Sequence, residues 1–334
     1  YGHAASRVKD PKFRMALSFH PLFIGGDPRR VTSMYILVSH LEKAFGVHYV
    51  QGGVQALADA MGTVVKRLGG SIFLNQRVEE ILVDQGKASG VKLSDGQTIK
   101  SDIVVSNADP GWTYKNLIKK SSKSRWTDKR LSQSKWSMGL FVWYFGTKGT
   151  KNSWKDVGHH TIINGPRYRG LLKDIFDKKF LAEDMSIYLH RPSCTDKTVA
   201  PGGSDTFYAL SPVPNLKTSN PVNWDEMGKI YKEKLRKVLN DIIPGFSETI
   251  ETEFVLNPED FMSRYLSPYG AGFSLEPRIF QSAWFRPHNV SEEVENLFLV
   301  GAGTHPGAGI PSVVTSAEVM AKLIPDASSV RTKL

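Results

Sequence analysis

The sequence has almost no cysteine and no long apolar run, and each absence narrows the class of protein. Cys194 is the only cysteine in 334 residues, so the chain has no internal disulfide and a cysteine-based metal site is disfavoured. A chain without disulfides is typical of the cytoplasm, which is the location we expect. No stretch reaches the roughly 18 apolar residues that a membrane-spanning helix needs.

Motifs that carry chemistry without a cofactor are also missing. The sequence contains no H-E-x-x-H, G-x-S-x-G, P-loop or C-x-x-C pattern. His159 and His160 are adjacent in an expected strand, where successive side chains point to opposite faces, so we do not expect them to share an ion and we predict no metal site. The net charge of +10 comes mostly from scattered basic residues. By itself it could serve nucleic acid, an anionic membrane surface or solubility, and we predict no nucleic-acid partner. Chemistry here belongs to a bound cofactor.

Residues 296–323 are the segment around which we interpret the rest of the chain. An apolar strand at 297–300 is followed by a glycine-dense turn at 301–311 and by a helix with apolar residues at i, i+3 and i+4 spacing. Glycine lets the backbone approach a ligand, and the first turn of a helix presents unpaired N–H groups to anions. The segment is either a cofactor-contacting turn or a purely structural connection.

The pattern of expected helices and strands changes along the chain, and this predicts a domain built from separated segments. Residues 51–110 and 291–334 are typical of α/β structure, residues 111–290 of α+β structure, and residues 1–50 of helices. The fold class is therefore α/β plus α+β, a Rossmann-like domain interrupted by a mixed-sheet domain. Expected helices are 6–19, 31–45, 54–68 and 225–242. Expected strands are 71–74, 78–83, 90–93, 98–101, 103–105, 136–145, 159–163, 185–190, 206–211 and 249–256.

Three local signals make these expectations more specific. The strand at 103–105 lacks alternation, which predicts burial on both faces. Asp109 is expected to cap a helix with Pro110 at its first position. Aromatic residues are dense within 111–290; we expect most in the core and some along an apolar cavity, where one face of the large sheet forms a wall.

The C-terminal part of the sequence resembles that of a known family. The run NLFLVGAGTHPGAGIPSVVTSA at 296–317, preceded by SAWFRPHN at 282–289, closely resembles the C-terminal signature of carotenoid desaturases of the bacterial phytoene desaturase type. These are members of the FAD-dependent amine oxidase-like superfamily. Supporting runs are LSFHPLFIGGDP, QGGVQALADAM, GGSIFLNQRVEEI, SNADP, GPRYRGLLKDIF and LAEDMSIYLHRPSCTD, so the resemblance covers nearly the whole chain.

The resemblance implies an FAD domain interrupted by a substrate domain. The family's N-terminal G-x-G-x-x-G loop is missing from this sequence, so we expect the chain to begin after the first part of the full protein and the FAD domain to be incomplete. Ser312 stands where related sequences commonly have glycine, a departure that alters the turn only slightly.

The resemblance also implies where FAD would lie. The Val-x-x-Ile segment at 78–81 lies near the adenine, the turn near the pyrophosphate and ribityl chain, and the following helix start at the isoalloxazine ring. A helix N-terminus favours the negative charge of a reduced flavin by about 0.3 to 1 kcal/mol. The implied cofactor-binding residues are Val78, Gly301, Ala302, Gly303, Thr304, His305, Gly309, Ile310, Pro311 and Val313.

The activity implied is FAD-dependent desaturation of phytoene or a similar long isoprenoid. Hydride would pass from a C–H bond to the flavin, the conjugated polyene would extend toward neurosporene or lycopene, and quinone or oxygen would be the final acceptor. Asp10 and Arg14, four residues apart on an expected helix, form either a polar pair near the flavin or a surface ion pair; we take them as the candidate catalytic residues.

The substrate resides in membrane, so the chain is expected to dock on a bilayer surface. The positive charge and the apolar segment at 13–24 suit peripheral binding, and the helical residues 1–50 are the expected contact region. Alternatives within the family are a C30 diapophytoene desaturase, a carotene isomerase and a ketolase. An alternative outside enzymes is a non-catalytic polyene-binding protein.

Overall fold

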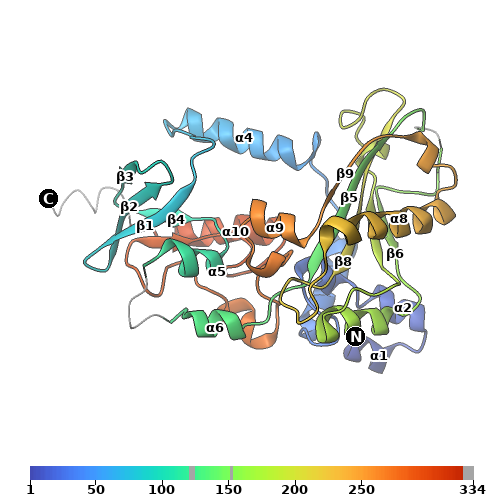
Figure 1. Ribbon diagram of the computed structural model, residues 1–334, viewed down its shortest axis with the longest axis horizontal. Coiled ribbons are helices and arrows are strands. Elements are labelled where there is room, and N and C mark those ends of the chain that lie inside the picture. The colour runs from blue at the N-terminus through green and yellow to red at the C-terminus, as the bar shows by residue number, and fades with distance from the viewer. Residues whose placement is uncertain (120–124, 151–152, 326–334) are drawn as a thin grey trace. The chain divides into compact units, whose positions relative to one another are not determined.

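The computed structural model describes residues 1–119, 125–150 and 153–325 (Figure 1). These divide into two compact units, each assembled from separated segments. Unit 1 contains residues 1–38, 75–138 and 262–334, and unit 2 contains residues 39–74 and 139–261. The boundaries differ from the expected ones at 50, 110 and 290, and the assignment of the segments to cofactor and substrate domains stays a prediction.

The N-terminal residues form two short helices in place of the expected single helix at 6–19. Helix α1 is Gly2–Arg7 and α2 is Pro11–Ala16, with extended backbone at Val8 and Asp10 between them. The single-helix expectation was wrong because Pro11 has no N–H to donate and fits only the first turn of a helix. Helix α3, Leu37–Phe45, follows.

Unit 1 contains two small sheets. Strands β1, Val78–Asp84, β2, Lys87–Leu93, and β3, Thr98–Lys100, form an antiparallel sheet, and β4, Val104–Ser106, pairs in parallel with β10, Leu297–Leu299. The parallel pair joins segments almost two hundred residues apart in the chain. The helices of this unit include α5 (Pro110–Trp112), α6 (Asp128–Gln133) and α10 (Ile310–Ala321).

Two strand expectations in this region were wrong. Residues 71–74 are irregular, not a strand. Val105 is 43% exposed, so β4 is buried on one face only, with Val104 and Ser106 directed inward. Asp109 caps α5 as expected, because its Oδ1 accepts a hydrogen bond from the Gly111 N–H at 2.7 Å.

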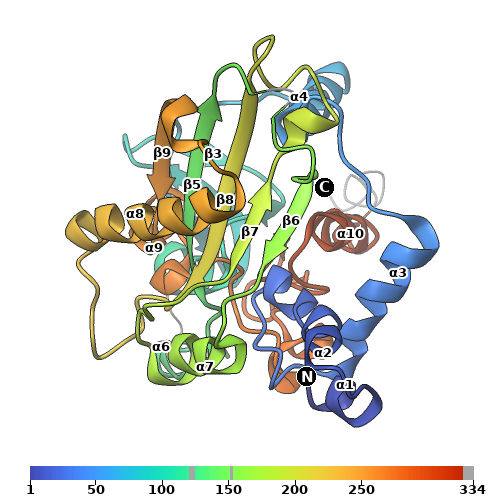
Figure 2. The ribbon, with the colours of Figure 1, turned by 90° about the vertical axis from the view of Figure 1, so that its right-hand side faces the viewer.

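Unit 2 is organised on a five-stranded antiparallel sheet in the order β6-β7-β8-β5-β9; Figure 2 displays these strands side by side. Its strands are β5 (Gly139–Thr147), β6 (His160–Ile163), β7 (Ile187–His190), β8 (Asp205–Val213) and β9 (Ile250–Leu256). Its helices are α4 (Gly53–Arg67), α7 (Tyr168–Lys173) and α8 (Trp224–Ile242), and α9 (Pro258–Arg264) lies at the unit boundary. The expected strand at 136–145 therefore begins three residues later.

One face of this sheet packs on α8. Phe141, Trp143 and Phe145 of β5 alternate toward that face and lie in one core with Tyr231 and Leu235 of α8. Because side chains alternate along a strand, the intervening residues belong to the opposite face. That second face is the wall that the sequence predicted.

None of the helices in the described residues is both long enough and apolar enough to cross a bilayer.

Candidate cofactor turn and candidate substrate face

The cofactor turn, residues 301–309, is held between β10 and α10 by hydroxyl groups. The Gly301 N–H donates to Ser316 Oγ at 2.9 Å, and Ser316 in turn donates to the Val313 carbonyl at 2.6 Å. The Thr304 hydroxyl, which is fully buried, donates to the Gly301 carbonyl at 2.8 Å. The second turn of α10, through Ser316, therefore fixes the start of the glycine turn.

Two of the glycines are required because the backbone passes close to the 107–110 segment. A Cβ on Gly301, whose φ is +109°, would lie 2.6 Å from Asn107 Nδ2, and a Cβ on Gly303 would lie 2.3 Å from Pro110 Cδ. Both distances are shorter than real Cβ contacts. The turn and the segment after β4 thus form one compact surface of unit 1.

A buried amide organises the strand, the turn and the helix together. Asn289, 3% exposed, directs Nδ2 toward the Leu299 carbonyl at 3.1 Å, the His305 carbonyl at 3.1 Å and the Ser316 carbonyl at 3.3 Å. These acceptors belong to β10, the cofactor turn and α10. One buried side chain therefore donates to backbone carbonyls of the strand, the turn and the helix.

Beside the turn lies a buried group of ionisable side chains. Arg286, 2% exposed, donates from Nη2 to the Ala302 carbonyl at 2.9 Å and from Nη1 to the Gln281 carbonyl at 3.3 Å. Burial lowers the pKa of Arg286 to about 10, although Tyr35 and Asp109 favour its charge. Burial also raises the pKa values of Tyr35 and Asp109. A fixed positive charge therefore supports the backbone of the cofactor turn.

The start of α10 is open to a ligand. Gly309 has φ +105° and an added Cβ would meet nothing within 4 Å. Ile310 is 51% exposed, Pro311 is exposed and Val313 is half-buried. These residues surround the N–H groups of the first helical turn, where the helix dipole favours negative charge.

Unpaired polar atoms nearby fit a bound cofactor. Within the described part of the chain, Arg286 Nε and His305 Nδ1 are buried and have no hydrogen-bond partner. Buried donors are normally paired, so both are available to a polar group placed against the turn. The open helix start, the close-packed glycines and these two nitrogens fit a group with apolar rings and anionic linkers, as FAD has.

The other site residues expected from the sequence lie elsewhere. Val78 begins β1, three residues before Ile81, which packs in one core with Leu297 and Leu299 of β10. Asp10 is exposed and caps α2 by accepting the Phe13 N–H at 2.8 Å. Arg14 donates from Nε to the Val8 carbonyl. The structure therefore gives Asp10 and Arg14 separate backbone partners, and their catalytic role stays a prediction.

Arg286, Asn289 and Asp109 were not singled out as site residues from the sequence. They lie in the runs SAWFRPHN and SNADP, which were read as parts of a family signature without individual roles. A charged or amide residue inside an apolar signature was the available signal, because such a residue needs a specific buried partner.

On unit 2, a row of aromatic rings crosses the face of the sheet opposite α8. Direct cross-strand partners place the rings in line, one from each strand. From β9 to β6 the aromatic row is Phe254, Tyr144, Tyr208, His190 and His160. The Tyr144 and Phe254 rings stack with centroids 4.6 Å apart, and the Tyr208 and His190 centroids are also 4.6 Å apart.

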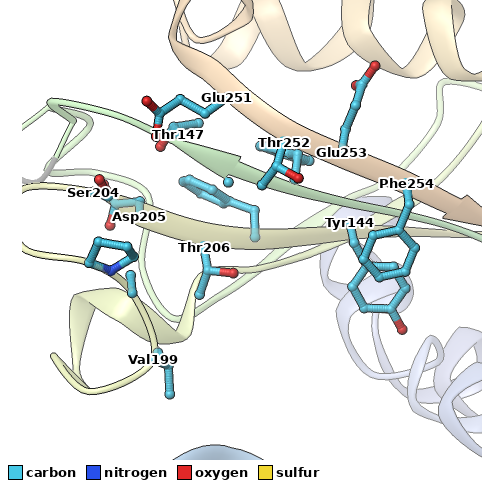
Figure 3. Close-up of a pocket in the computed structure, with 15 residues that line it drawn as sticks. Tyr144, Thr147, Val199, Ser204, Asp205, Thr206, Glu251, Thr252, Glu253 and Phe254 are labelled. Carbon is cyan, nitrogen blue, oxygen red and sulfur yellow. The ribbon is translucent and has the colours of Figure 1, made fainter.

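A cavity of about 260 Å³ lies at the end of this row formed by Tyr144 and Phe254. Figure 3 displays Thr206, Thr252, Tyr144 and Phe254 on its lining. Thr206 and Thr252 both pair with Gly146, in the row next to Tyr144. The missing side chain of Gly146 leaves room beside the rings, and residues 199–201 complete the lining.

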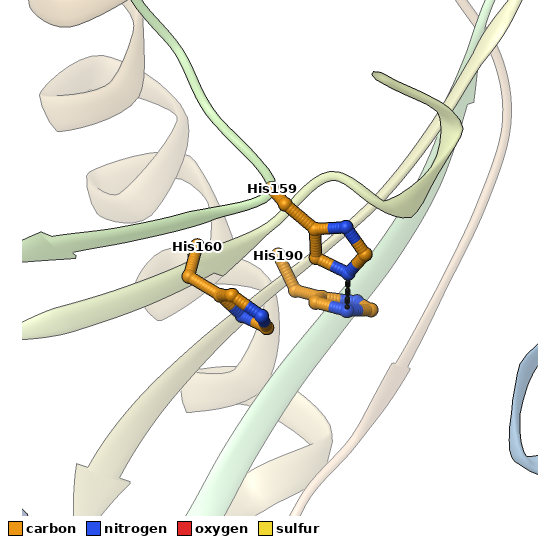
Figure 4. A group of neighbouring side chains, drawn as sticks. All are labelled: His159, His160 and His190. Carbon is orange, nitrogen blue, oxygen red and sulfur yellow. Dashed lines mark hydrogen bonds between the residues drawn. The ribbon is translucent and has the colours of Figure 1, made fainter. Parts of the chain in front are cut away.

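The geometric reason for expecting that His159 and His160 do not share an ion, their placement on opposite faces of one strand, was wrong. His159 precedes β6 and is not part of the strand, so strand alternation does not separate the two rings. Ring nitrogens of His159, His160 and His190 all lie within 4.8 Å of one another (Figure 4).

Comparisons with known proteins identify the family of this chain. Residues 2–324 match the family model described as flavin containing amine oxidoreductase. The chain is 63% identical over 99% of its length to a neurosporene-forming phytoene desaturase of Cereibacter sphaeroides, and 41% identical over 97% of its length to a lycopene-forming phytoene desaturase of Paracoccus. It spans 64% of the length of each of these relatives.

A solved structure is similar in fold. An oxidoreductase from Methanosarcina mazei superposes with a TM-score of 0.66 and 18% identity, over 96% of this chain and 67% of that one. At this identity the likeness concerns the fold alone.

Proposed function

Because this chain belongs to the flavin-containing amine oxidoreductase family, we propose that it carries out FAD-dependent desaturation of phytoene or a similar long isoprenoid in carotenoid biosynthesis. The resemblance to bacterial phytoene desaturases noted in the sequence is confirmed at 63% identity. Since the chain spans less than two thirds of those relatives, activity, substrate and partners are proposed here.

The observation that carries the choice of substrate is the aromatic row. A conjugated isoprenoid is flat, apolar and long, and it gains most from a line of rings that it can cover continuously. Phe254 is 58% exposed and Tyr144 and Tyr208 are half-buried, so the row offers ring surface that the fold itself does not cover. Covering this ring surface with an apolar chain contributes about 25 cal/mol per Å² of apolar surface removed from water.

The residues of the cofactor turn and the start of α10 are those that would hold FAD. When bound, FAD supplies a two-electron acceptor for hydride from the isoprenoid C–H bond, a task that no side chain can perform. Arg286 holds the Ala302 carbonyl, so the backbone presented to the cofactor is fixed before binding. Ile310 and Val313 offer apolar surface beside the helix start, so a ring bound against them would exclude water and strengthen the electrostatic effect of the N–H groups there.

We place the protein in the cytoplasm at a membrane surface. Several apolar side chains of the N-terminal helical region are exposed although the unit has a core of its own; they are Phe13 (55%), Phe23 (38%), Met34 (75%) and Leu37 (52%). With a net charge of +10, this region suits docking on anionic lipid. Phe13→Ser should weaken sedimentation with anionic liposomes at low salt, whereas Phe180→Ser, equally exposed at 48%, should not. Equal binding by both variants would contradict this docking surface.

The proposal is tested by supplying phytoene in liposomes, with FAD, to the chain expressed with all that its reading frame encodes upstream. A red-shifted polyene absorption spectrum is expected, and the conjugation length distinguishes a neurosporene from a lycopene product. Repeating the assay without oxygen, with and without added quinone, identifies the acceptor. Bound FAD without colour would favour the isomerase, the ketolase or the C30 substrate, and absence of FAD binding would favour a non-catalytic polyene-binding protein.

A variant pair tests the substrate face separately. Phe254→Ala removes one exposed ring of the aromatic row and should raise KM for phytoene several-fold without loss of bound FAD. Phe180→Ala removes a ring of similar exposure elsewhere and should leave KM unchanged. If the two variants have the same KM, the row does not bind substrate.

A further inference from the structure

Three histidines converge at one end of the aromatic row. His160 opens β6 and His190 closes β7, and the two are direct cross-strand partners. His159 precedes β6 and turns its ring over His190, as Figure 4 displays. His160 and His190 are also the last two members of the aromatic row, but zinc binding is measured apart from desaturation, so failure of this inference is distinguishable from failure of the proposed function.

Neighbouring hydroxyls hold Nδ1 of two of these rings, and for His159 the direction of the hydrogen bond leaves Nε2 available. His159 Nδ1 lies 2.6 Å from Thr195 Oγ1, and Thr195 donates its own proton to the Pro192 carbonyl at 3.3 Å. Thr195 therefore accepts from His159 Nδ1–H, which leaves the lone pair of His159 on Nε2. His160 Nδ1 lies 2.6 Å from the Tyr188 hydroxyl. A hydrogen bond at Nδ1 that orients the ring is the usual arrangement around a metal-binding histidine.

His190 completes the set. Its Nε2 is hydrogen-bonded to Nε2 of His159 at 3.0 Å, a contact that an ion bound between the two rings would replace, and its buried Nδ1 has no hydrogen-bond partner among the described residues.

We propose that His159, His160 and His190 bind one divalent transition-metal ion of the Zn²⁺ class, with a fourth coordination position open to solvent. Two imidazole nitrogens on a tetrahedral zinc ion at about 2.0–2.1 Å are about 3.3 Å apart, close to the 3.0 Å between His159 and His190. The exposed ring of His160 closes the remaining gap by side-chain rotation. Imidazole ligands select Zn²⁺, Cu²⁺ or Ni²⁺ over Mg²⁺ and Ca²⁺.

The surroundings favour a cation. The carboxylate of Asp196 acts on His159 and that of Glu42 acts on His160, each favouring positive charge. The rings of Tyr49 and Tyr208 pack against His159 and His190 respectively and limit access of water from those sides.

The test uses the untagged full chain, loaded with Zn²⁺ and then freed of loosely bound ion by dialysis. One zinc per chain by elemental analysis is expected, together with the visible absorption of tetrahedral cobalt when Co²⁺ replaces zinc. His160→Gln, at an exposed position, should weaken zinc binding at least tenfold. His3→Gln, an exposed histidine of α1, is the matched control and should bind as the unaltered chain does.

Two results would overturn the proposal. One is zinc binding well below one per chain, or equal binding by the unaltered chain and His160→Gln, which would indicate an adventitious ion only. The other comes from X-ray absorption of the zinc-loaded unaltered chain, which needs no variant to fold: three imidazole ligands are expected, and a spectrum with one or none would contradict the site.

Discussion

The buried amide of Asn289 allows a sharp test of how the cofactor turn is built. Its Nδ2 approaches carbonyls of β10, the turn and α10 at 3.1 to 3.3 Å, and an amide nitrogen has two hydrogens to donate. Asn289→Ala therefore leaves two buried acceptors unpaired. Since each such loss costs about 1 to 3 kcal/mol, the free energy of unfolding should fall by about 2 to 6 kcal/mol.

A matched control separates burial from the mere loss of a hydrogen bond. Asn116 also donates from Nδ2 to a carbonyl, that of Trp112 at 3.2 Å, but it is exposed, so water replaces the bond. Asn116→Ala should change stability by no more than about 0.5 kcal/mol. Asn289→Asp, of the same size, turns a donor into an acceptor that faces carbonyl oxygens, and it should cost at least as much as Asn289→Ala.

The measurement is urea unfolding followed by tryptophan fluorescence, with FAD affinity measured in parallel. Both Asn289 variants should bind FAD less tightly because the turn is no longer held to α10. If Asn289→Ala unfolded at the same urea concentration as Asn116→Ala, the amide would not organise the turn and the argument from its hydrogen bonds would be refuted.

Three further predictions concern other parts of the chain. Asp10→Asn keeps a good helix cap and removes a charge, so it should leave thermal stability unchanged, whereas Asp10→Ala should lower the free energy of unfolding by about 0.5 to 2 kcal/mol. A loss of turnover in Asp10→Asn, without a loss of stability, would support the catalytic role. Unchanged turnover would remove it. Gly303→Ala would place its Cβ 2.3 Å from a proline ring carbon and should abolish FAD binding, whereas Gly158→Ala, with nothing within 4 Å, should bind normally; equal binding would contradict the close approach. Burial raises the pKa of Asp205, but hydrogen bonds led by Arg191 lower it below 3.8 overall. The unfolded chain therefore binds the proton first as pH falls, so stability should decrease from about pH 5 downward, and Asp205→Asn should flatten that slope in acid-unfolding curves.

The elements that the sequence predicted best are those whose signal is local. The strand, glycine turn and helix at 297–323 follow from a short apolar run, a glycine cluster and periodic apolar residues, and all three are present as β10, the cofactor turn and α10. Helix α8 was also predicted from a local signal, since its apolar residues repeat at helical spacing. Asp109 before Pro110 likewise identifies a helix start without any knowledge of distant contacts.

Where local signals competed, the sequence alone was misleading. The apolar residues at 6–19 suggested one helix, but Pro11 ends any helix that approaches it from the N-terminal side. The apolar run at 103–105 suggested a strand covered on both faces, yet Val105 is 43% exposed. Burial of a strand depends on which elements pack on each face, and a run of residue types does not contain that information.

Tertiary structure alone decided which distant residues meet. The register of five strands places Phe254, Tyr144 and Tyr208 in one row, and a shift of one residue would turn each ring to the other face. The same register brings His190 opposite His160, and the path of the chain before β6 adds His159. The burial of Arg286 and Asn289 against the cofactor turn arises similarly. The sequence by itself determined the elements and the family, because periodicity and signature motifs are local; the pairings that build the cofactor turn, the aromatic row and the histidine cluster depend on strand register and packing between segments far apart in the chain.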